Sequence, residues 1–175
     1  MREIVFRGKK TDNGEWVEGY LVKKIDPLLS IGKWFILTQE YDTNCIDGSP
    51  TTLKVEMTWY KINPETVGQY TGLTDKNGKR IFEGDILHFK TYQGGGFACP
   101  IGTDVYYRVL FGSCNPDMNT LTEYVGFWAL GKNYDEDDLY EYGSSISYLV
   151  NSHGACVIGN IHDNPELLKE GATND

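Results

Sequence analysis

The sequence predicts a mainly β protein, and three features of its composition carry that prediction. Residues that favour strands (Val, Ile, Thr, Tyr, Phe and Trp) make up 59 of the 175 residues, whereas alanine, the best helix former, occurs only four times. Glycine occurs 20 times, which indicates many tight turns. Within this class we expect an antiparallel N-terminal β unit over residues 1–66. A small SH3-like barrel of bent strands with acidic insertions should follow over residues 67–175, with a short C-terminal helix.

The first unit begins with a hairpin. Residues 2–9 alternate between apolar and polar, and Asp12-Asn13-Gly14 supplies the turn that leads into a return strand over residues 15–23. Gly19 lies inside that strand and leaves room for a close neighbour or a bulge. Residues 33–40 and 52–62 are expected to form two further strands, separated by a polar loop over residues 41–52.

The second unit opens with another tight turn, formed by the segment from Asp75 to Gly78. A strand over residues 79–90 should bend at Glu83-Gly84, and shorter strands are expected at residues 105–111, 124–130, 146–150 and 156–161. The glycine-rich residues 91–104 read as a loop. Asn164 as the cap and Pro165 as the first helical residue predict a short helix over residues 164–171.

The charge is divided unevenly along the chain. Residues 1–90 carry 13 acids and 13 bases, whereas residues 91–175 carry 12 acids and three bases, so the net charge of −9 belongs to the second half. This excess argues against nucleic-acid binding through that half. The sequence has no apolar run of about 20 residues, no signal-peptide pattern at its start and no C-x-x-C pair among its four cysteines. We therefore expect a cytoplasmic protein with reduced thiols and no membrane partner.

Four patterns in the sequence are candidate sites of chemistry. His153-x-x-Cys156 has metal-ligand spacing and could be completed by Cys99 and Cys114, and a Cys/His pair could also form a nucleophile. The acids at residues 135–141 lack the spacing of a calcium loop, and the glycines at 94–96 lack the following Lys-Ser/Thr of a phosphate loop. A packed thiol, a solvated acidic loop and a plain connection explain these patterns better. The sequence therefore predicts no catalytic residue, no metal and no cofactor, and hence no enzyme.

Three sequence blocks cover residues 1–21, 64–87 and 157–168. In this order and spacing, they resemble the YopX family of phage and prophage proteins. The motif residues, for which we expect structural roles, are Trp16, Gly19, Tyr20, Gly72, Asp75, Asn77, Gly78, Glu83, Gly84, Asp85, Gly159, Asn160, Asn164 and Pro165. The resemblance implies a small phage-encoded protein of a bacterial host cell that forms homo-oligomers. It implies no catalytic residues, and residues 26–52 and 91–150 lie outside the matching blocks.

Three hypotheses for function follow. The first is a non-enzymatic accessory protein that assembles with itself and binds a host or phage protein, in keeping with the tyrosine-rich acidic half. The second is nucleic-acid association through bases of the neutral half, namely Lys9, Lys10, Lys23, Lys24, Lys76, Lys79 and Arg80. The third is a DNA-mimicking regulator, whose acidic residues 91–175 would compete with DNA for a host factor.

Overall fold

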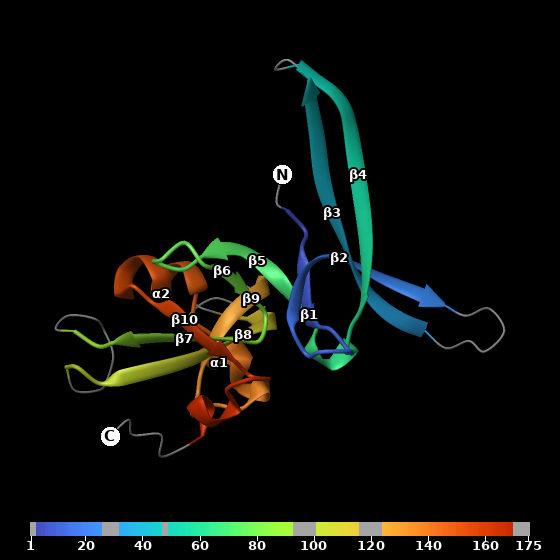
Figure 1. The fold of residues 1–175 in the computed structure, drawn as a ribbon. Coiled ribbons are helices and arrows are strands. Elements are labelled where there is room, and N and C mark those ends of the chain that lie inside the picture. The colour runs from blue at the N-terminus through green and yellow to red at the C-terminus, as the bar shows by residue number, and fades with distance from the viewer. Residues whose placement is uncertain (1–2, 26–31, 47–48, 93–100, 116–123, 170–175) are drawn as a thin grey trace. The chain divides into compact units, whose positions relative to one another are not determined.

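The structure is a computed structural model that describes residues 3–25, 32–46, 49–92, 101–115 and 124–169 (Figure 1). The chain divides into two compact units, unit 1 over Met1–Gln69 and unit 2 over Tyr70–Asp175. The fold is mainly β, as predicted, with all strands paired antiparallel in a six-stranded and a four-stranded sheet. No helix of the described part of the chain is long and apolar enough to span a membrane.

Unit 1 is built from a sheet with the strand order β4-β3-β2-β1-β5, which continues through β5 to β6. The strands are β1 (Phe6–Lys9), β2 (Trp16–Ile25), β3 (Gly32–Ile46), β4 (Ser49–Lys61) and β5 (Gly68–Thr74), with the 3₁₀ helix η1 (Pro64–Thr66) before β5. The predicted hairpin at Asn13-Gly14 joins β1 to β2, and Gly14 has the positive φ of 72° that this turn requires.

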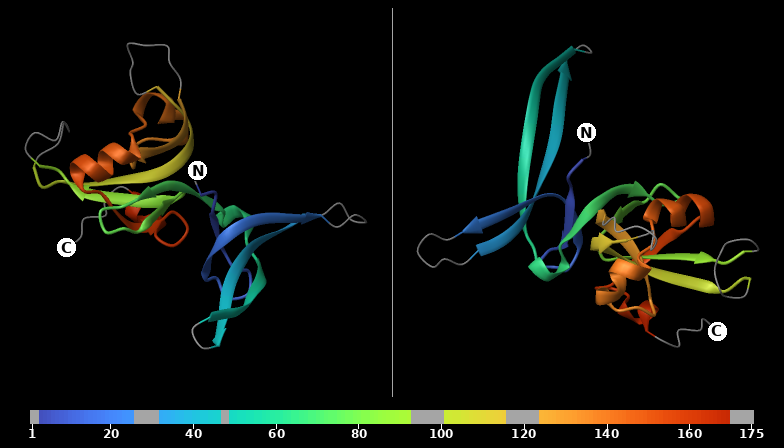
Figure 2. Two further views of the ribbon diagram at one scale, coloured as in Figure 1. Left: turned by 90° about the horizontal axis from the view of Figure 1, so that it is seen from above. Right: turned by 180° about the vertical axis from the view of Figure 1, so that it is seen from behind.

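The predicted loop over residues 41–52 is wrong, because β3 and β4 run through most of it as one long hairpin whose tip, residues 47–48, lies outside the described residues. Strand β2 pairs with β3 only from Gly32 to Leu37, so the rest of this hairpin has just its two own strands (Figures 1 and 2). A two-stranded ribbon does not need an apolar face, and its polar sequence therefore resembles that of a loop.

The buried apolar side chains of unit 1 include Val5, Ile36 and Ile62. The strands approach closely there because glycines replace side chains. A Cβ atom on Gly8 would lie 2.9 Å from Cδ1 of Ile62, and one on Gly19 would collide with the backbone carbonyl oxygen of Leu37. The close neighbour expected at Gly19 is therefore confirmed.

Unit 2 contains β6 (Arg80–Phe82), β7 (Asp85–Lys90), β8 (Asp104–Cys114), β9 (Tyr124–Gly131) and β10 (Cys156–Asn160). Its sheet has the order β10-β7-β8-β9. Between β9 and β10 the chain forms the 3₁₀ helix η2 (Glu136–Asp138), α1 (Leu139–Tyr142) and α2 (Ile146–His153). Ile146 and Leu149 of α2 pack on Leu87, Phe89 and other buried side chains of the sheet, which makes this the main core of unit 2.

The strand predicted over residues 146–150 is wrong, since these residues form α2. Its apolar residues recur with helical spacing at Ile146, Leu149 and Val150, the Ser145 side chain accepts a hydrogen bond from Tyr148 N, and Gly154 ends the helix with φ = 64°. As a helix, that segment cannot supply a strand to a barrel. Neither sheet closes on itself within the described residues, so the predicted SH3-like barrel is absent from them.

The short C-terminal helix is confirmed as the 3₁₀ helix η3 (Pro165–Leu168), with Pro165 as its first residue. Asn164 stands at the N-cap position, as expected, but its side chain makes no capping hydrogen bond. The Asn164 side chain instead occupies the space beside Gly159, where a Cβ atom would collide with it.

Candidate functional site

The motif residues of the turn between β5 and β6 fix β10 to the start of unit 2. Asp75 is 5 % exposed, and its Oδ1 accepts hydrogen bonds from the backbone N–H groups of Asn77 (2.8 Å) and Lys79 (2.9 Å). Its Oδ2 accepts a third from Val157 N at 3.0 Å. Burial acts to raise the pKa of Asp75, but these three N–H donors outweigh it, so the pKa is lowered. The ionised carboxylate therefore acts as a charged clamp, in the sense that it links the turn between β5 and β6 to β10.

A second group of motif residues joins β6, β7 and β10. Glu83 and Gly84 form the turn between β6 and β7, which is the predicted bend, and Gly84 has φ = 80°. The Gly84 carbonyl accepts a hydrogen bond from Ile161 N at 2.9 Å. Asp85 is almost fully buried, accepts one from Phe82 N at 2.8 Å and pairs in register with Asn160 of β10.

The remaining motif residues shape turns and surfaces. Gly72 and Gly78 have φ values of 87° and 81°, at the irregularity in the β5–β6 pairing and in the Asp75 turn respectively. Asn160 is buried, and its Oδ1 accepts hydrogen bonds from the N–H groups of His162 and Asp163. The guanidinium carbon of Arg7 lies over the Trp16 ring, 4.7 Å from the centroid of that ring. Tyr20, in contrast, is 49 % exposed.

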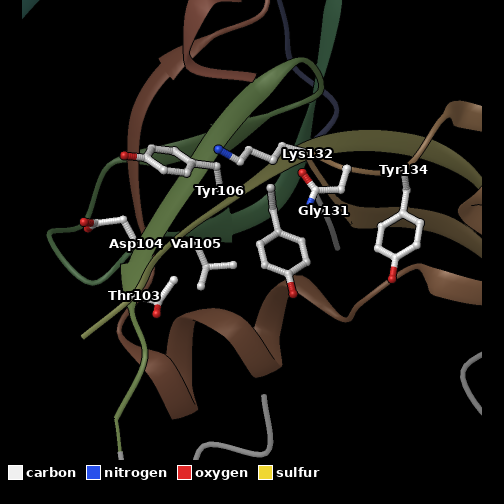
Figure 3. A pocket seen from close by; sticks show the side chains of 9 residues that line it. Thr103, Asp104, Val105, Tyr106, Gly131, Lys132 and Tyr134 are labelled. Atoms are coloured by element: carbon white, nitrogen blue, oxygen red, sulfur yellow. The ribbon is translucent and has the colours of Figure 1, made fainter. Parts of the chain in front are cut away.

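An edge pocket of about 340 Å³ lies in unit 2, beside the start of β8, which extends past the end of its antiparallel partner β9 (Figure 3). Tyr107 of β8 pairs with Gly131, the last residue of β9, and the chain then turns away through Lys132 to Tyr134, which also line the pocket. The Lys132 ammonium lies over the Tyr106 ring at 5.0 Å.

A histidine–aspartate pair stands beside this pocket. Nε2 of His88 lies 2.7 Å from Oδ1 of Asp104, and Nζ of Lys90 lies 3.7 Å from Oδ2. The hydrogen bond with His88 is the main cause that lowers the pKa of Asp104. No other described side chain is hydrogen-bonded to the His88 imidazole. The charges of this pocket are therefore largely engaged with one another, which leaves little for a ligand.

A groove of about 480 Å³, the aromatic groove, lies in unit 1 and is lined by Val22, Lys23, Lys24, Phe35 and Trp59. Strand alternation places Val22, Phe35 and Trp59 on the same face of the sheet. The rings of Phe35 and Trp59 meet edge to face, with their centroids 6.0 Å apart. Trp59 is 50 % exposed, and the same face carries Met57 at 59 % and Tyr20. This is a continuous apolar surface open to solvent.

Sequence reasoning missed this groove, although part of its signal was present. In the strand predicted over residues 52–62, Met57 and Trp59 belong to an apolar stripe that alternates with polar residues. The groove also needs Val22 and Phe35 from two other strands. Only the register of β2 with β3 and of β3 with β4 brings them beside Trp59.

The sequence candidates for a metal or a nucleophile are dispersed. The His153 ring packs among Phe89, Tyr92 and Tyr148, and burial lowers its pKa. Cys156 Sγ donates to the His88 carbonyl at 3.7 Å. Buried Cys114 donates to the Gly143 carbonyl at 3.4 Å, and burial raises the pKa of this thiol. Cys99 and the glycines at 94–96 lie outside the described residues, among which no cluster of three potential metal ligands occurs.

The acidic run is not the loop that was expected. Residues 136–142 form η2 and α1, and Asp135, Glu136 and Asp137 are exposed to solvent. The proposed nucleic-acid bases do not share one face in unit 1, since Lys9 and Lys24 lie on one face of the sheet and Lys23 on the other.

Comparison with known proteins gives one family match. The family described as YopX protein matches residues 5–95, which is more than half of the chain. A crystal structure of protein EF1440 from Enterococcus faecalis has 24 % sequence identity with this chain and a TM-score of 0.48. The alignment covers 97 % of this chain and 100 % of that one. No curated protein matches the sequence.

Proposed function

Because this chain belongs to the YopX family, we propose that it is a non-enzymatic accessory protein that assembles with itself and binds a phage or host protein. The aromatic groove carries this proposal. Large exposed apolar side chains gathered on one face mark protein interaction sites, and Trp and Tyr are the residues that most often dominate binding energy. Trp59, Tyr20 and Met57 are such side chains, and they occur together on the face that the groove opens.

The edge pocket supports an enzyme less well. General acid–base chemistry needs a group that can exchange a proton with a substrate, and a nucleophile needs an adjacent base. The His88 imidazole is engaged with Asp104, and no described hydroxyl or thiol is hydrogen-bonded to it. Binding through the groove requires none of this, since shape and apolar contact are sufficient.

Analytical ultracentrifugation tests the proposal on the full chain. The wild type is expected to self-associate with increasing concentration, and Trp59→Ala to shift this equilibrium strongly toward monomer, since it removes the exposed ring at the groove. Phe111→Ala is the matched control, because Phe111 is exposed to a similar extent (54 %) but lies on β8 of unit 2. A wild type that is monomeric at the highest soluble concentration, and that retains no protein from phage-infected cell extract, would refute the proposal.

A further inference from the structure

Three lysines flank the aromatic groove on its own face. Lys24 and Lys33 are direct cross-strand partners between β2 and β3, and Lys61 pairs with Phe35 between β3 and β4. All three are exposed, and none makes an ion pair with a described residue. Like charges directly opposite one another destabilise a sheet. A bound anionic group beside the groove would relieve that repulsion.

The face is selective in the sign of its charge. Among the described side chains of β2, β3 and β4, Glu18 is the only acid on this face, because Glu40 and Glu56 point to the opposite side of the sheet. The groove therefore combines an apolar floor with a positive rim. It fits a protein segment that carries both aromatic side chains and carboxylates.

The chain itself contains a segment of this kind, the acidic segment, formed by residues 134–142. Asp135, Glu136 and Asp137 are exposed there and make no ion pair with a described residue. Tyr134 and Tyr142 stack on one another with centroids 4.5 Å apart, and both rings remain exposed, as does that of Tyr140. Carboxylates and phenol rings are thus presented together.

The acidic segment is held in shape before it binds anything. Leu139 is buried against the position of Gly112, and the Tyr140 carbonyl accepts a hydrogen bond from Asn115 N at 2.8 Å. Asp138 closes the first turn by accepting one from Asp135 N at 2.9 Å. Because its backbone is ordered already, docking of the segment would lose little conformational entropy.

We propose that the acidic segment of one copy docks on the lysine-flanked aromatic groove of a second copy, so that the protein assembles head to tail. This inference rests on the proposed function and names the contact by which the protein self-associates. The two surfaces are different patches of one chain, so the interface is heterologous and each bound copy leaves one groove and one acidic segment open for the next.

A single-stranded nucleic acid would also meet lysines and an aromatic ring, but it fits the groove less well. Its phosphates carry no apolar group to cover Val22 and Met57, which share the face with Trp59. The chain also has a net charge of −9, which opposes a polyanion. The acidic segment complements both the positive charge of the lysines and the apolar side chains of the groove.

Charge reversal of each partner surface tests the contact. Variant one is Lys24→Glu with Lys33→Glu, and variant two is Asp135→Lys, Glu136→Lys and Asp137→Lys. Each alone is expected to weaken self-association about tenfold or more, measured by analytical ultracentrifugation. Lys76→Glu with Lys79→Glu reverses two exposed lysines of unit 2 and should leave self-association unchanged.

Mixing the two variants gives the decisive measurement. Variant one keeps a native acidic segment and variant two keeps a native groove, and the two reversed surfaces are also opposite in charge. An equimolar mixture should therefore self-associate more strongly than either variant alone. If Trp59→Ala abolishes assembly while both charge variants assemble like the wild type, the proposed function stands and this inference is wrong. A wild type that stays monomeric would also overturn it. So would binding of a labelled single-stranded DNA that is lost in variant one, if self-association of variant one equals that of the wild type.

Discussion

The carboxylate of Asp75 should be one of the largest single contributors to the stability of unit 2. It is buried and accepts three backbone hydrogen bonds, two within its own turn and one from Val157 of β10. Asp75→Asn changes only the chemistry of one side-chain atom. The amide oxygen can still accept from Asn77 and Lys79, but the amide nitrogen then faces Val157 N, and two donors cannot bond to each other.

The expected magnitude follows from these contacts. A hydrogen bond to a charged group contributes roughly 1.5–3 kcal/mol, and a buried donor left without a partner adds a desolvation cost of similar size. We therefore expect Asp75→Asn to lower the free energy of unfolding of unit 2 by about 2 kcal/mol. Asp75→Ala removes all three acceptors and should cost about 3–4 kcal/mol, less than the sum because Asn77 and Lys79 lie at the surface where water can replace the carboxylate.

Urea unfolding at pH 7, together with amide hydrogen exchange at Val157, measures this cost. The exchange of that amide should accelerate in Asp75→Asn, whereas amides of unit 1 should be unaffected. Asp12→Asn is the matched control, because Asp12 begins the equivalent turn in unit 1 but is exposed and accepts only from Asn13 N. Its effect should stay below about 0.5 kcal/mol.

The pH dependence adds a second criterion. The folded-state pKa of Asp75 is lowered below its ordinary value of 3.8, so its contribution is complete above that value and is lost as the pH falls through the folded pKa. The difference between wild type and Asp75→Asn should therefore shrink below pH 3.8. Equal urea midpoints at pH 7, or a difference that is independent of pH, would refute the clamp.

Two further predictions concern packing and protonation. Gly19→Ala should lower the free energy of unfolding by about 1–3 kcal/mol, because the new methyl group meets the Leu37 carbonyl, and Gly126→Ala, which has open space, should not; thermal unfolding distinguishes them. The free energy of unfolding should fall as the pH drops below about 6.5, because burial keeps the folded-state pKa of His153 below the unfolded one. His153→Phe should make the free energy of unfolding depend less on pH between pH 7 and 5.5. Equal pH dependence of the two proteins in urea titrations would contradict this prediction.

The elements that the sequence predicted well are those fixed by local chemistry. The turns at Asn13-Gly14 and Asn77-Gly78 need residues that tolerate positive φ, and such residues are visible in any sequence. The α2 helix was missed because the β-branched residues Ile146 and Val150 suggested a strand. Its own signals, Ser145 as the cap and Gly154 as the stop, were present but less conspicuous.

The aromatic groove could not be predicted because it depends on pairing between distant segments. The stripe that contains Trp59 was visible, but which residues lie beside it depends on strand register. A shift of β3 by one residue would move Phe35 to the other face and separate Lys24 from Lys33. Local preference does not determine such a register, and the candidate site is therefore a property of the assembled sheet.

The strand order of unit 2 also has a consequence for biosynthesis. Strand β10 is the last strand to be made, yet it lies beside β7 and supplies Val157 to Asp75, a contact that spans 82 residues. Chains emerge from the ribosome N-terminal end first, and contacts between distant residues form slowly. The residues of unit 1 have all emerged once residue 69 has left the ribosome, whereas unit 2 lacks β10 until residue 160 has emerged. A chain truncated before residue 156 would thus contain all of unit 1 but would lack β10 and the Val157 donor to Asp75 in unit 2.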